Sequence, residues 1–147
     1  MEIRELVEQE IGKALDLVLE TFMEFEAPDY GSTGVNTFIN CLNDKDFVGR
    51  LKFYGAFKNE LLIGVTATRD EGNHIAMFFV NKAHHKKGIG RALFEYILPK
   101  STGDIMTVNS SPYAVDIYRK LGFIATSEEQ VTDGIRFTPM EYKKQLI

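Results

Sequence analysis

The residues best suited to chemistry lie in two short segments of the second half of the chain. The first is a turn rich in cations and glycine, with Lys86, Lys87, Gly88, Gly90 and Arg91. Backbone N–H groups at the start of a helix bind phosphate, and cationic side chains add to that binding. Glycine also removes the side chain where an anion must approach the backbone. This turn predicts an anion site, with a solvated basic turn as the alternative.

The charge distribution also favours one local anion site. The chain has 17 Lys+Arg and 21 Asp+Glu, a net charge of −4, yet residues 74–94 contain no acidic side chain. A general nucleic-acid binder needs a basic domain, so this acidic chain argues against nucleic acid as a partner. A P-loop is excluded because Gly-Lys-Ser/Thr is absent. A dinucleotide fingerprint is excluded because Leu93 stands where its third glycine belongs.

The second segment runs from Asn109 to Phe123. Ser111 and Pro112 are typical of a helix start, with Ser111 as N-cap and Pro112 in the first turn. The spacing of apolar residues predicts that this helix buries Ala114, Ile117, Tyr118 and Leu121. From this pattern alone Tyr118 fits a core aromatic, and Asn109 fits a turn residue.

Apolar periodicity predicts the elements that must position these segments. We expect strands at residues 3–7, 52–57, 61–69, 75–80, 105–108, 123–126 and 135–142. We expect helices at residues 9–26, 33–42, 88–98 and 112–121. Residues 75–80 are apolar on both faces, which indicates a central strand covered on both sides. The order β-α-α-β-β-β-α-β-α-β-β predicts a single α/β domain over residues 1–147.

Both segments resemble signatures of the GNAT N-acetyltransferase superfamily. Residues 85–90, His-Lys-Lys-Gly-Ile-Gly, are similar to its pyrophosphate loop, Gln/Arg-x-x-Gly-x-Gly/Ala, with His85 departing from the pattern. Residues 109–123 are similar to its second signature, a strand ending in Asn and a helix with Ala-x-x-x-Tyr-x-x-x-Gly-Phe. The resemblance implies a mixed, mostly antiparallel central sheet flanked by helices.

The resemblance also implies that acetyl-CoA is the co-substrate, bound where the strands at 75–80 and 105–108 part. Backbone groups of Phe78, Phe79 and Val80 would pair with the pantetheine amides. Asn109, Ala114 and Tyr118 would line the pantetheine arm. The pyrophosphate would be held by His85, Lys86, Lys87, Gly88, Ile89, Gly90 and Arg91.

The implied reaction is direct attack of an amine on the thioester in a ternary complex. Tyr118 is the candidate general acid, and the N–H of Val80 or a neighbour is the candidate oxyanion donor. His74 is the candidate general base, because it lies six residues before Val80, where some family members carry Glu. Alternatively, His74 only begins the strand, and water relays the proton to Asp70 or Glu71.

The acceptor is less defined. Residues 1–30 contain nine acidic and two basic side chains, including Glu20, Glu24, Glu26 and Asp29. We hypothesise that some of them attract a cationic small amine or a peptide lysine; an ordinary solvated helix face is the alternative. Two other functions stay open: a non-catalytic acyl-CoA sensor, and an acetyltransferase acting on aminoacyl-tRNA.

The remaining expectations concern location and further cofactors. The single cysteine, Cys41, allows no internal disulfide and fits a reducing cytoplasm. No apolar run reaches the roughly 20 residues that span a membrane, and no signal-peptide pattern begins the chain. The three histidines lack metal-ligand spacing, so no metal is expected. A homodimer is one option for the assembly.

Overall fold

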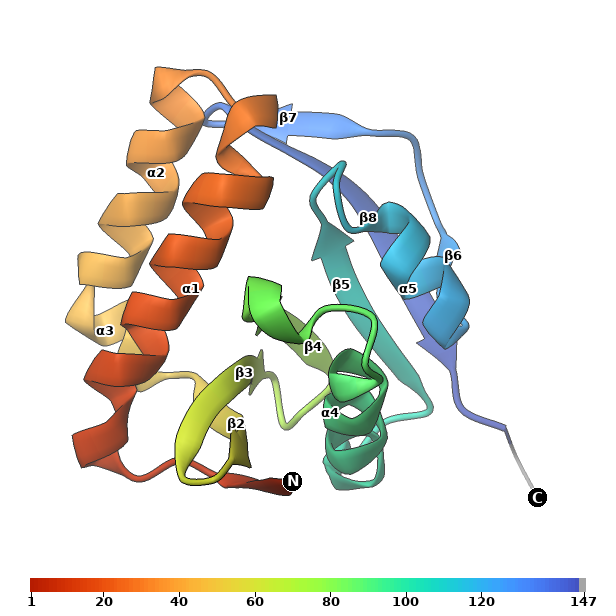
Figure 1. The fold of residues 1–147 in the computed structure, drawn as a ribbon. Helices are drawn as coiled ribbons and strands as arrows, with labels where there is room; N and C mark the ends of the chain where they lie inside the picture. Colours follow the sequence, from red (N-terminus) through yellow and green to blue (C-terminus); the bar gives the residue numbers. More distant parts are fainter. Residues whose placement is uncertain (146–147) are drawn as a thin grey trace.

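The computed structural model describes residues 1–145, a mixed sheet with helices on both faces (Figure 1). The strands are β1 (Glu2–Glu5), β2 (Lys52–Lys58), β3 (Leu61–Arg69), β4 (His74–Val80), β5 (Ile105–Ser110), β6 (Ile124–Ala125), β7 (Gln130–Thr132) and β8 (Ile135–Lys143). The helices are α1 (Ile11–Phe25), α2 (Ser32–Asn43), α3 (Lys45–Gly49), α4 (Ile89–Ile97) and α5 (Val115–Leu121). No helix among these described residues is long and apolar enough to cross a membrane.

The strand order is β1-β2-β3-β4-β5-β8-β6, with β7 paired to β8 beyond this path. Only β4 and β5 run parallel; the other pairs within the described residues are antiparallel. A parallel pair needs a crossover, and α4 supplies it between β4 and β5. The expected mixed, mostly antiparallel sheet is confirmed.

Each face of the sheet has its own apolar core. Helices α1 to α3 lie on one side, and α4 and α5 lie on the other (Figure 1). On the first side, Val18 and Phe22 of α1 pack with Met77 and Phe79 of β4. On the second side, residues of α4 and α5 pack with β5 and β8, including Phe94, Met106, Tyr118, Phe123 and Met140.

A β-bulge lies in the middle of β4. Ala67 of β3 faces Met77, but the next residue, Thr68, faces Ile75, so Ala76 is an extra residue in the ladder. The bulge reverses the alternation of side chains along β4. Ile75 therefore packs in the core on the α4 and α5 side, whereas Met77 packs on the α1 side.

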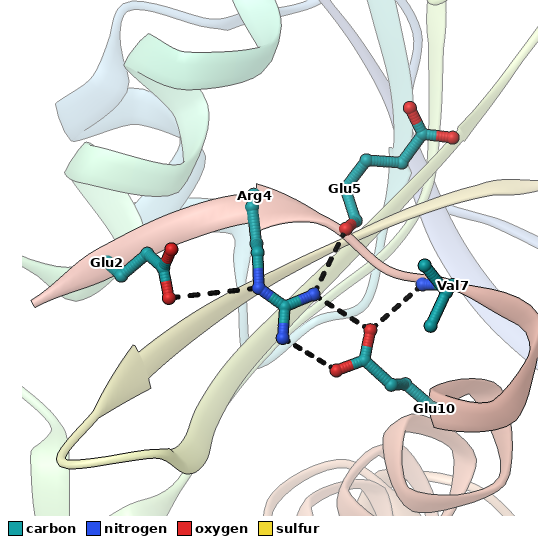
Figure 2. A network of polar contacts seen from close by, with 5 residues as sticks. All are labelled: Glu2, Arg4, Glu5, Val7 and Glu10. Carbon is teal, nitrogen blue, oxygen red and sulfur yellow. Dashed lines mark hydrogen bonds and ion pairs between the residues drawn. The ribbon is translucent and has the colours of Figure 1, made fainter.

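The first strand is joined to the first helix by a polar network (Figure 2). Arg4 of β1 donates two hydrogen bonds to the carboxylate of Glu10, at 2.8 and 2.7 Å, and its guanidinium lies over the Phe57 ring. Glu10 Oε1 also accepts the backbone N–H of Val7 at 2.9 Å. This bond satisfies an N–H at the start of the 3₁₀ turn that leads into α1.

The structure corrects four expectations. Residues 112–114 form a turn closed by Ala114 N–H on the Ser111 carbonyl, so α5 begins at Val115 and Ser111 is not its N-cap. Ile117 is 41% exposed rather than buried. Residues 130–132, between the expected strands at 123–126 and 135–142, were expected in a polar loop but pair with β8 as β7. Finally, α3 was not expected, although Asp44 is a strong N-cap whose side chain accepts two backbone N–H groups.

Candidate functional site

An opening in the sheet lies between β4 and β5. The two strands pair only at His74 with Thr107 and Ile75 with Val108. Both strands then continue, to Val80 and Ser110, without pairing to each other. Most of β4 therefore has no partner on its β5 side and forms a strand edge inside the sheet, the kind of edge to which an extended ligand can add.

The register of β3 and β4 determines which backbone groups face this opening. Asn81 N–H donates to the Ile63 carbonyl at 2.8 Å. Since hydrogen-bonded pairs alternate in an antiparallel ladder, the N–H and C=O groups of Phe79 and Met77 point to β3. Those of Phe78 and Val80 point into the opening. Of the three residues expected to pair with pantetheine, Phe79 thus has its backbone groups directed away from the opening.

The basic turn follows β4 and leads into α4. Gly88 has φ +81°, a left-handed conformation that glycine adopts without strain. The Gly88 carbonyl accepts the N–H of Ala92, so the N–H groups of Ile89, Gly90 and Arg91 have no acceptor within the helix. Lys86 and Lys87 are exposed beside these groups. The turn thus combines free helix N–H groups with positive charge, as an anion site requires.

Two residues of the turn have structural roles that the sequence did not indicate. The ring of His85 packs against Phe25, with centroids 4.8 Å apart, and its Nε2 bonds the Val80 carbonyl at 2.6 Å. Histidine here therefore holds the turn against the end of β4. A Cβ on Gly90 would lie 3.2 Å from the Phe78 ring, so a larger residue there would require the ring to shift by a few tenths of an ångström.

The opening leads into a cavity of about 410 Å³ that brings together residues from both ends of the chain. Three predicted site residues outside β4 line it, Asn109, Ala114 and Tyr118, and so does His74 at the start of β4. A larger hollow of about 940 Å³ between β1, α1 and the β2–β3 turn contains none of the predicted catalytic or cofactor-binding residues, although Glu20 of the acidic N-terminal segment lines it. We therefore take the cavity beside β4 as the candidate active site.

Tyr118 presents its hydroxyl to this cavity. The ring is buried in the core, 5.7 Å from Phe78 and 5.4 Å from Phe123 between centroids, and the residue is 4% exposed. Among the described residues the hydroxyl has no hydrogen-bond partner, and the cavity leaves it accessible to water. Burial and then the nearby Glu26 raise the pKa of this phenol, which keeps it protonated at neutral pH.

His74 lies where β4 and β5 are still paired. Its Nδ1 bonds the Thr107 hydroxyl at 2.7 Å. Burial, and secondarily Arg69, lower the pKa of His74 to about 4. The imidazole is therefore uncharged at neutral pH.

Glu26, at the end of α1, lines the same cavity. It is the C-cap residue, whose backbone N–H donates to the Phe22 carbonyl at 2.9 Å. Burial is the main cause that raises the pKa of Glu26 to about 7; the negative charge of Asp29 adds to the rise, and hydrogen bonding with Ser111 opposes it. A carboxyl group that is half ionised at neutral pH is suited to proton transfer.

Comparison with known proteins identifies the family. A sequence profile described as "Acetyltransferase (GNAT) domain" matches residues 26–144. This chain belongs to the GNAT acetyltransferase family.

Solved structures of GNAT proteins share the whole fold. A GCN5-related N-acetyltransferase from Rhodopseudomonas palustris superposes with a TM-score of 0.83 at 16% identity, covering 97% of this chain and 94% of the other. The PaiA N-acetyltransferase of Thermoplasma acidophilum, solved with coenzyme A, gives 0.75 at 22% identity, covering 97% and 98%. An aminoglycoside 6′-N-acetyltransferase, also solved with coenzyme A, gives 0.63 at 12% identity, covering 97% of each chain.

In this GNAT chain the far wall of the cavity comes from residues that the sequence did not indicate. Thr132 of β7 and Ile135 and Phe137 of β8 line it. The β7–β8 hairpin packs on α2, and a Cβ on Gly34 would lie only 2.2 Å from the Gly134 carbonyl oxygen. An Asp-Gly pair at 133–134 is a turn signal, and it was the one available clue to this hairpin.

The acidic side chains of the N-terminal segment are not gathered at the site. Glu20 lies outside the cavity, and Glu24 forms an ion pair with Lys82 at 2.7 Å. Glu26 is the acidic residue of this segment that lines the cavity. Its other walls are largely aromatic, including Phe22, Tyr30, Phe38, Phe47 and Phe137. Among the described residues no group of three or more His, Cys, Asp or Glu side chains could hold a metal ion.

Proposed function

We propose that this chain is an acetyl-CoA-dependent N-acetyltransferase that moves an acetyl group to a primary amine by direct attack in a ternary complex. The observation that carries the proposal is the unpaired edge of β4, which leads from the basic turn to a cavity with the free hydroxyl of Tyr118. Family membership supports transfer of an acyl group. The two CoA-bound neighbours support coenzyme A as its carrier.

The cofactor assignment follows from the backbone groups of β4 and of the start of α4 that have no hydrogen-bond partner within the sheet or the helix. The pantetheine arm would add to β4 through the backbone groups of Phe78 and the N–H of Val80, next to Asn109 and Ala114, because the Val80 carbonyl is already bonded to His85. The pyrophosphate would take the helix N–H groups at Ile89, Gly90 and Arg91. Lys86 and Lys87 would supply countercharge, and Gly88 the turn. His85 would act through the turn, since its Nε2 is engaged by the Val80 carbonyl.

Groups of this cavity can supply the oxyanion donor and the acid that the transfer needs. The lone pair of the neutral amine attacks the thioester carbonyl, and a backbone N–H of Val80 or Phe78 stabilises the oxyanion. The C–S bond then breaks, and Tyr118 donates its proton to the departing thiolate. The proton lost by the amine needs a base, for which the sequence predicts His74.

The test is acetyl transfer by the purified chain. Acetyl-CoA is offered with a mixed panel of small amines and lysine peptides; thiol release is followed, and products are identified by mass spectrometry. We expect thiol release that depends on an acceptor and a product heavier by one acetyl group. Binding of CoA without acceptor-dependent release would instead indicate a sensor module. Modification of aminoacyl-tRNA alone would identify a different acceptor class.

A further inference from the structure

Glu26 holds an unusual position for a carboxyl group. It is the C-cap residue directly after α1 and precedes a 3₁₀ turn at Ala27–Asp29. Ser111 and Tyr118, from the opposite end of the sequence, line the same cavity as this side chain. The residue is partly exposed, but its carboxyl is enclosed enough that burial dominates its ionisation.

No cation compensates this carboxyl among the described residues. None of the ion pairs there involves Glu26. Arg69, the cation that lines the same cavity, lies 4.0 Å from Asp70 instead. Burying a charge without a partner is costly, so a fold seldom keeps one without a use for it.

The groups facing Glu26 come from every neighbouring element. Asp29 and Tyr30 follow it in the chain, and Tyr113 and Tyr118 face it from the α5 side. Cys41 of α2, His74 of β4 and Arg69 of β3 complete the titratable lining of the cavity. The charge that acts on its ionisation, that of Asp29, is negative, so it favours the protonated form, as burial does.

We propose that Glu26 is the general base, which takes the proton of the acceptor amine as the amine attacks the thioester. The inference rests on the proposed function and assigns the base within it. Among the described residues, Glu26 is the one carboxylate that lines the cavity where the neutral amine attacks. As the C–N bond forms, the nitrogen passes one proton to the Glu26 carboxylate, and as the C–S bond breaks, Tyr118 passes its proton to the thiolate; exchange with water afterwards removes the proton from Glu26 and restores that of Tyr118.

Glu26 and Tyr118 have well-separated pKa values, as the base and the acid of one reaction require. A pKa of about 7 leaves Glu26 largely ionised just above neutrality, whereas the phenol stays protonated there. Two titratable groups whose pKa values are shifted apart by their environment are typical of the acid and the base of an active site. His74, with its pKa lowered to about 4, is a weak base at neutral pH, and Thr107 occupies one of its two nitrogens.

The experiment compares Glu26→Gln with Glu20→Gln, which makes the same change on the same helix outside the cavity. For each purified protein, kcat is measured from pH 5.5 to 9 with acetyl-CoA and the best amine of the panel at saturation. CoA affinity is measured by calorimetry, and thermal unfolding reports folding. In parallel, the carboxyl carbons of ¹³C-labelled glutamate are titrated by NMR to read the pKa of Glu26 without turnover.

We expect the wild type and Glu20→Gln to show a rise in kcat with a midpoint near pH 7. In Glu26→Gln, kcat should no longer rise near pH 7 and should be about 100-fold lower than wild type at pH 8, with CoA affinity unchanged. The inference would be overturned if this variant keeps the rise in kcat and loses less than threefold in kcat. A carboxyl titration midpoint near pH 4.5 for Glu26 by NMR would overturn it as well. No acetyl transfer by the wild type to any amine would instead overturn the proposed function.

Discussion

Tyr118→Phe separates chemistry from structure at the proposed site, because it removes one oxygen and keeps the ring. The ring packs against Phe78 and Phe123, and these contacts persist in the variant. The hydroxyl has no hydrogen-bond partner among the described residues, so no protein acceptor is orphaned by its loss. We expect the free energy of unfolding to change by less than about 0.5 kcal/mol.

The effect on the reaction should be far larger. A positioned general acid contributes about 10²–10⁴-fold to a rate, and a hundredfold loss corresponds to about 2.7 kcal/mol in the activation barrier. Without the phenol, the thiolate must leave unprotonated or take its proton from water. The loss therefore appears in kcat, while binding of acetyl-CoA, which depends on the β4 edge and the basic turn, stays within about twofold.

The assay is single-turnover acetyl transfer at saturating acceptor, with calorimetry for CoA affinity and urea unfolding for stability. A value of kcat within threefold of wild type would refute the assignment of Tyr118 as the acid. An equal loss in CoA affinity and kcat would show that the hydroxyl binds the cofactor rather than protonating the leaving group.

Two further predictions concern the scaffold. Gly34→Ala puts a methyl group against the Gly134 carbonyl oxygen. It should lower the free energy of unfolding in urea by about 1–3 kcal/mol and raise the KM for the acceptor. The control Gly12→Ala has open space around its Cβ and should stabilise α1 instead. Hydrogen bonding with Arg4 lowers the pKa of Glu10 from 4.5 to about 2, so the stability difference between wild type and Glu10→Gln should be constant above about pH 4.5 and shrink as the pH falls toward 2. A difference independent of pH between 2 and 7 would contradict the Glu10 prediction.

The parts of the site that sequence could predict are those set by local spacing. The basic turn, Asn109 and Tyr118 lie at fixed distances along single strand–turn–helix units, so one short pattern places each of them. The parting of β4 and β5 was expected from family resemblance, and their register bears it out. The bulge at Ala76 was not expected, because a continuous apolar run reads the same with or without an extra residue.

The parts that sequence could not predict depend on contacts between distant segments. Glu26 was one of nine acids in the first thirty residues, and its own neighbours in sequence do not distinguish it from Glu20 or Glu24. Its place in the cavity beside Ser111 and Tyr118, more than eighty positions away, arises only when the chain folds. The cavity wall at β7 and β8 likewise depends on the close approach of Gly34 and Gly134.

The acid and the base of the proposed mechanism are coupled through charge. The Glu26 carboxylate helps to raise the pKa of Tyr118, so its protonation by the amine removes that charge and makes the phenol a stronger acid as the thiolate forms. Each proton transfer thus favours the other, and the two substitutions should not act independently. We expect the double variant Glu26→Gln/Tyr118→Phe to be about tenfold more active than the product of the two single losses predicts, a coupling of about 1.4 kcal/mol. Strictly multiplicative losses in kcat would show that the two groups act in separate steps.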